Sequence, residues 1–159
     1  MIANFNKLAG VALLLCLTGC NKAAYLNMGK EDDIAETAEK YIGSTDWARD
    51  GSKYPNDDKE KKFFYPKGSW KCNLFVNDVL YDSGIEPPKT NGGWPITASM
   101  WTRSVAGWGT VSSQQRGDVV SDGSHCGIAI SSARTVAAGE NRVYEGSDIS
   151  GTIQRHNES

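Results

Sequence analysis

The sequence predicts an α+β fold in which N-terminal helices pack on a small antiparallel C-terminal sheet. Two helical patterns, at residues 31–43 and 72–84, come first along the chain. Four short β-branched or alternating segments follow between residues 117 and 146, separated by Gly, Ser and Asn. Helices followed by strands are typical of an α+β domain.

The N-terminus indicates export. Lys7 precedes an apolar and small-residue run at residues 8–17, which is shorter than the about 20 residues that a membrane-spanning helix needs. The run ends in Leu17-Thr18-Gly19-Cys20. This tetrapeptide resembles the lipobox of bacterial lipoproteins, in which the cysteine is acylated and becomes the mature N-terminus. The alternative is an ordinary signal peptide in which Cys20 is incidental.

The lipobox resemblance implies a periplasmic protein held to a membrane by its lipid. Asn21 stands where an Asp favours inner-membrane retention in enterobacterial lipoproteins, so the resemblance favours the outer membrane. We expect residues 1–19 to be a signal peptide, residues 20–30 a lipidated tether and residues 31–159 the functional domain.

Composition excludes some classes of partner. Removing residues 1–19 removes only Lys7, which leaves 16 of the 17 basic residues, all 19 acidic residues and a net charge of −3. The chain lacks the surplus of basic residues that indicates nucleic-acid binding. The remaining residues suit one domain with its own core. The cysteines and histidines lack the paired spacing of zinc ligands, so we expect no metal and no cofactor.

The first helix is predicted over residues 31–43. Three acidic residues at its start suit the positive end of the helix dipole, and Gly43 offers a stop. The residues that share its apolar face are Ile34, Ala38, Tyr41 and Ile42. Residues 44–69, which include a charge run at 56–62, form a long polar loop of the kind that is often functional.

The second helix is predicted to begin at Cys72 and to end at Gly84, which can supply a left-handed turn. Its spacing predicts one buried face. The residues on that face are Cys72, Phe75, Val76, Val79 and Leu80, and those on the other sides are Asn73, Asn77, Asp78 and Asp82.

The second half of the chain is predicted to form the sheet. A loop at residues 86–95 and a short helix around residues 97–104 lead to the strands. The strands are predicted at residues 117–121, 125–132, 134–139 and 141–146. The polar tail that holds His156 is predicted to fray.

Cys72 and His125 are the candidates for nucleophilic chemistry. Unsatisfied N–H groups in the first turn of a helix stabilise a thiolate, and a nucleophilic cysteine needs a base. If His125, at the start of a strand, points toward Cys72, strand alternation turns Cys126 away. The competing hypothesis is a Cys72–Cys126 disulfide, which an oxidising compartment permits. On this geometry the two hypotheses exclude each other.

Two motifs resemble those of the NlpC and CHAP families of papain-like cell-wall hydrolases. “KCNLFVNDVL” at residues 71–80 is similar to their nucleophile helix, and “RGDVVSDGSHCGIAIS” at residues 116–131 is similar to the strands that carry their base. Arg116, Ser124 and Cys126 depart from the usual Pro, Gly and Val or Ala. The resemblance covers roughly residues 60–148 and implies a papain-like fold.

The resemblance implies that Cys72 is the nucleophile and His125 the base. A third residue, which orients the imidazole, is expected just beyond the strand of the base, with Glu140 and Asn141 ranked ahead of Asp148.

Aromatic residues near Cys72 are the candidates for substrate binding. Because the segment before the nucleophile lines the cleft in related folds, we expect Tyr65, Trp70 and Asn73 to contact substrate. Trp101 and Trp108 are expected to lie in the core.

The resemblance implies a peptidoglycan amidase or endopeptidase that cleaves stem-peptide amide bonds. Its expected partners are the stem peptides, the membrane through the lipid anchor, and an inhibitor or immunity protein. The alternative is a non-catalytic lipoprotein that binds cell-wall peptide or a protein partner on the same fold. A transferase or deamidase that uses the same dyad is a third hypothesis.

The anchor can be tested by replacing Cys20. Cys20→Ala should abolish labelling by a fatty-acid analogue and release the protein from the membrane fraction, because the acylated sulfur is lost. Labelling and fractionation of whole cells measure both effects. Unchanged labelling of the variant would contradict the lipoprotein hypothesis.

Overall fold

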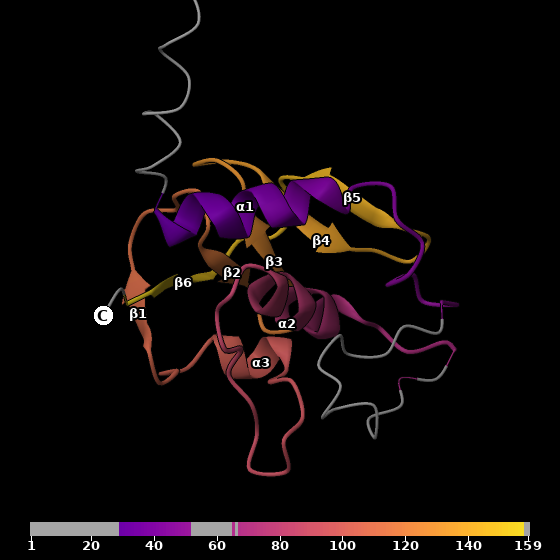
Figure 1. Ribbon diagram of the computed structural model, residues 1–159, viewed down its shortest axis with the longest axis horizontal. Coiled ribbons are helices and arrows are strands. Elements are labelled where there is room, and N and C mark those ends of the chain that lie inside the picture. Colours follow the sequence, from indigo (N-terminus) through magenta and orange to yellow (C-terminus); the bar gives the residue numbers. More distant parts are fainter. Residues whose placement is uncertain (1–28, 52–64, 66, 158–159) are drawn as a thin grey trace, which may run out of the picture.

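The computed structural model describes residues 29–51, 65 and 67–157 (Figure 1). The signal peptide, the lipobox and the charge run at residues 56–62 lie outside the described residues. The helices are α1 (Lys30–Lys40), α2 (Cys72–Asp82) and α3 (Ala98–Trp101). The strands are β1 (Trp108–Val111), β2 (Val119–Ser121), β3 (Cys126–Ala129), β4 (Thr135–Ala138), β5 (Val143–Gly146) and β6 (Thr152–His156).

All six strands form one antiparallel sheet in the order β1-β6-β2-β3-β4-β5. Helices α1 and α2 lie side by side over its central strands, and α3 contacts β2 (Figure 1). Alternate strand residues such as Ile128 and Val136 pack with both helices in the main core. Their neighbours Ala129 and Ala137 belong to a smaller cluster with Ile149. The α+β class and the small antiparallel sheet are therefore confirmed.

The first helix is shorter than predicted. Ile34 and Ala38 are fully buried as expected, but α1 ends at Lys40 and Tyr41 caps it. Gly43 then adopts a positive φ of 88° and turns the chain. Ile42 was predicted on the buried face and is instead 43 % exposed, because it follows the last helical turn.

The buried face of α2 is confirmed, and it is wider than predicted. All five residues predicted on that face are at most 5 % exposed. Asn77 and Asp78 were predicted on the outer sides and are buried as well. The reason is that the 44–51 loop covers this side of α2, where the Trp47 indole donates to the Asp78 carboxylate at 2.8 Å.

The four predicted strands are confirmed as β2 to β5, and two strands were missed. Trp108 begins β1, and the tail predicted to fray forms β6 between β1 and β2. The ring of His156 packs on Trp108 with centroids 5.2 Å apart, so its placement in a frayed tail was wrong. Hydrophobic periodicity did not predict β6, because the side chains that this strand directs into the protein are polar and are held there by hydrogen bonds. Gln154 donates to the Arg103 carbonyl at 2.8 Å, and Arg155 pairs with buried Asp118 at 2.8 Å.

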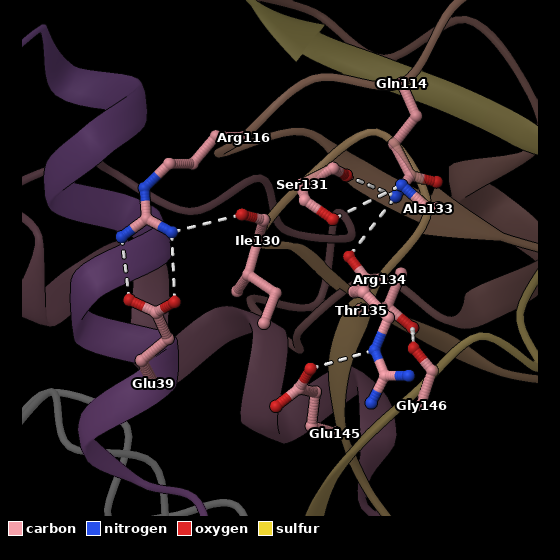
Figure 2. A network of polar contacts seen from close by, with 10 residues as sticks. All are labelled: Glu39, Gln114, Arg116, Ile130, Ser131, Ala133, Arg134, Thr135, Glu145 and Gly146. Atoms are coloured by element: carbon pink, nitrogen blue, oxygen red, sulfur yellow. Dashed lines mark hydrogen bonds and ion pairs between the residues drawn. The ribbon is translucent and has the colours of Figure 1, made fainter.

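The turn that leads into β2 ties the sheet to α1. Arg116 donates two hydrogen bonds, of 3.0 and 2.7 Å, to the carboxylate of Glu39 in α1, and a third to the Ile130 carbonyl (Figure 2). Figure 2 also shows Arg134 reaching Glu145 across the β4–β5 pair. In the described part of the chain, no helix is long and apolar enough to cross a membrane.

Candidate functional site

Cys72 and His125 meet where the first turn of α2 packs against the start of β3. Cys72 is the first residue of α2, and His125 directly precedes β3. A tight turn fixes the backbone of the histidine, because Asp122 accepts the N–H groups of Ser124 and His125, each at 2.7 Å. The two side chains are close enough for each to shift the pKa of the other.

Cys126 does not point away from Cys72, contrary to the prediction. Its side chain is fully buried in the helix-facing core, together with Cys72. The alternation argument failed because His125 lies in the turn before β3 and not in the strand. Both His125 and Cys126 therefore reach the same sulfur, and both cysteines are free thiols. His125 and Cys126 can therefore both lie close to Cys72.

The surroundings of Cys72 favour a thiolate. The Cys126 thiol donates to the Cys72 sulfur and is the largest cause that lowers the pKa of Cys72 to about 5, with His125 adding a hydrogen bond and its charge. The same contacts raise the pKa of His125, mainly through Cys72, and raise the pKa of buried Cys126 well above its usual value. At neutral pH Cys72 is therefore a thiolate, while Cys126 stays protonated.

Tyr144 and Asp148 hold the other side of the imidazole. The Tyr144 hydroxyl lies 3.4 Å from Nε2 of His125, and the two rings are parallel within 4°. The same hydroxyl donates to Asp148 at 2.5 Å. Gly139 and Gly146 give the tyrosine room, since a Cβ on either would lie 2.9 Å from its ring. Tyr144 was not predicted, because a tyrosine on a strand is usually packing.

Glu140 and Asn141, which were ranked first as the third residue, lie on the β4–β5 turn and not on the imidazole. Glu140 faces Arg49 with an ion-pair distance of 3.6 Å. Among the described residues, neither Glu140 nor Asn141 hydrogen-bonds the His125 ring, whereas the lower-ranked Asp148 reaches it through Tyr144.

An open cavity of about 610 Å³ lies beside His125. Its lining comes from the segment before α2, the turn before β3 and the β4–β5 hairpin. The lining residues are Trp70, Ser124, His125, Gly139, Glu140, Asn141, Arg142 and Tyr144. Cys72 is 5 % exposed and is not among the lining residues, whereas His125 is.

Of the three predicted substrate contacts, Trp70 lines the cavity and is 53 % exposed. The Arg49 guanidinium lies over the Trp70 ring at 5.3 Å and holds it in place. Tyr65 and Asn73 are not among the lining residues. They hydrogen-bond each other at 3.3 Å, and Tyr65 packs on Trp94. Trp101 and Trp108 lie in the core as predicted.

No cluster of three or more His, Cys, Asp or Glu side chains among the described residues could hold a metal ion. The chain matches no protein-family model, no curated protein and no solved structure.

The thiolate can be tested by alkylation with iodoacetamide as a function of pH. The rate at Cys72 should rise with a midpoint near pH 5 and then stay level, because the thiolate is the reactive form and its pKa is about 5. His125→Ala should move the midpoint toward the about 8.5 of an ordinary thiol. Mass spectrometry of the labelled peptide separates Cys72 from Cys126, which should stay unlabelled. A wild-type midpoint above pH 8 would contradict the thiolate.

Proposed function

We propose that this protein is a cysteine hydrolase that cleaves amide bonds in peptidoglycan stem peptides, on a papain-like fold of the NlpC and CHAP type. The observation that carries the proposal is the contact of Cys72 with His125 beside an open cavity. The order of the elements supports it, since the nucleophile opens a helix and the base precedes a strand of an antiparallel sheet. The choice of peptidoglycan rests on the two sequence motifs.

The two residues supply the attacking group and the acid. The Cys72 thiolate attacks the amide carbonyl and forms a tetrahedral oxyanion. The N–H of Cys72 lies in the first turn of α2, where N–H groups have no acceptor within the helix, and it can donate to that oxyanion. The His125 imidazolium protonates the leaving amine, and a thioester remains. Neutral His125 then takes a proton from water, and the hydroxide formed releases the acid.

The Tyr144–Asp148 pair supports the charged form of His125. The Asp148 carboxylate and the Cys72 thiolate both raise the pKa of the imidazole. The Tyr144 hydroxyl, which lies between the Asp148 carboxylate and the His125 ring, fixes the plane of that ring. We assign to Tyr144 and Asp148 the orienting role that a single third residue has in a catalytic triad.

The proposed location follows from the N-terminal sequence. A lipid on Cys20 would anchor the protein to a membrane in the periplasm, where stem peptides are present, and Asn21 favours the outer membrane. A non-catalytic protein that binds cell-wall peptide in the same cavity is the rival function, and the loss-of-function test below distinguishes the two.

Loss of either catalytic residue should abolish turnover. Cys72→Ala and His125→Ala should each stop the release of fragments from purified peptidoglycan. The double variant should be no worse than either, because a nucleophile and its acid–base partner act as one unit. Chromatography of the soluble fragments measures the rate.

The control is Arg134→Gln, which changes an exposed side chain outside the cavity and should leave the rate unchanged. Each variant must keep the circular dichroism of the wild type. Wild-type turnover by well-folded Cys72→Ala would exclude Cys72 as nucleophile, and an inactive wild type that still binds the fragments would favour the non-catalytic rival.

The role of Asp148 predicts a pH effect. Its carboxylate raises the pKa of His125, and the leaving amine needs the protonated ring, so activity is lost as pH rises through that pKa. Asp148→Asn should therefore move the alkaline limb of the kcat profile to lower pH. Tyr144→Phe should lower kcat by about 10-fold or more with little change in KM, by analogy with the loss of an orienting group.

Glu140→Gln is the control for Asp148, since it changes a carboxylate of the same cavity that does not hydrogen-bond the ring. Its pH profile should match the wild type. If Glu140→Gln moves the alkaline limb and Asp148→Asn does not, the orienting residue is Glu140, and our assignment is wrong.

A further inference from the structure

Arg142 brings a positive charge into the cavity without a carboxylate beside it. Four of the five other arginines among the described residues have acidic partners, and Arg103 is the exception: Arg49 pairs with Glu140, Arg116 with Glu39, Arg134 with Glu145 and Arg155 with Asp118. Within the described residues, the Arg142 side chain has no such partner, although Glu140 lies two residues earlier on the same turn. Because Glu140 pairs with Arg49, the carboxylate of the β4–β5 turn already has a cationic partner.

The position of Arg142 sets how far its guanidinium is from the reacting centre. Arg142 directly precedes β5 and Tyr144 is the second residue of that strand, and both line the cavity. The Cα atoms of residues two apart in the chain lie at most about 7 Å from each other. Since Tyr144 contacts the ring of His125, Arg142 lies roughly one to two peptide residues from the amide that Cys72 attacks.

We propose that Arg142 is the specificity-determining residue of this site and binds a free carboxylate of the peptide substrate, one or two residues from the scissile amide. The proposal rests on the proposed function and names its substrate class: peptides that carry an unblocked carboxylate at that distance. A guanidinium can bind a carboxylate with two parallel hydrogen bonds, which a neutral amide cannot reproduce. Stem peptides carry such carboxylates, and some of them are amidated in certain cell walls.

The rest of the cavity fits a ligand that is charged on one side only. Trp70, on the segment before α2, offers an exposed ring that the Arg49 guanidinium already covers in part. Asn141 and Ser124 provide neutral polar groups.

The experiment compares stem tetrapeptides that differ in one group. The probes are a muramyl tetrapeptide with all carboxylates free and two versions in which either the glutamate or the diaminopimelate carboxylate is amidated. Binding is measured by calorimetry on full-length Cys72→Ala, which cannot turn them over if the proposed function holds. Arg142→Gln in that background should weaken binding of the free peptide by about 10- to 100-fold, as for loss of a charge-assisted pair. It should not change binding of the version whose amidated group is the one Arg142 holds.

Two matched variants keep the test sharp. Arg134→Gln removes another exposed arginine, one that lies outside the cavity, and should change nothing. Arg142→Lys should restore part of the affinity because the charge remains. In the active enzyme, the loss in Arg142→Gln should appear in KM and kcat/KM for the free peptide, and not in the pH profile.

The outcomes separate this inference from the proposed function. If Arg142→Gln binds the free and both amidated peptides with unchanged ratios, or if no probe binds at all, the inference is wrong. If wild-type protein cleaves the peptides while Arg142→Gln still discriminates the free from the amidated peptides as the wild type does, only the inference fails. If binding depends on Arg142 but the wild type cleaves none of the peptides, the carboxylate site stands and the hydrolase proposal fails.

Discussion

The packing of the first turn of α2 against the start of β3 is the contact on which the site depends. It brings a helix-start sulfur, an imidazole and a second thiol into one small volume. Neither element could place these groups alone, because Cys72 and His125 are 53 positions apart in the chain. The sulfur there is nearly enclosed, and burial by itself opposes a charge. The two hydrogen bonds from His125 and Cys126 reverse this effect, so that the thiolate is the stable form.

The 44–51 loop holds the start of α2 in place through a buried lysine. Lys71, the residue before the nucleophile, is 1 % exposed and donates to the carbonyls of Ala48 and Arg49, each at 2.9 Å. Desolvation lowers its pKa, and the nearby Asp50 opposes that shift. This buried ammonium ties the 44–51 loop to the start of α2. The same loop supplies Arg49, so one set of contacts positions both the nucleophile and the wall that carries Trp70.

Periodicity was enough to predict α2, its buried face and four strands, because these segments bury apolar side chains at regular spacing. It could not predict β6, whose inward groups are polar, or the burial of Asp78, which depends on a tryptophan 31 positions earlier. The side chains at the site were partly predictable. Cys72 and His125 were found from their place in the elements, whereas Tyr144 needed the hairpin geometry that two glycines permit. Cys126 was misplaced because one residue decided whether His125 belonged to the turn or the strand.

The position of β6 between β1 and β2 affects the order in which the sheet can form. This last strand lies between β1 and β2, so it contributes the neighbours of both. A polypeptide that emerges with its N-terminus first can pair β2 to β5 early, but β1 has no partner in the sheet until β6 is present. Until then Asp118 is without its Arg155 partner, and the sheet presents an open edge. Completion of the sheet is thereby delayed until β6 has taken its place between β1 and β2.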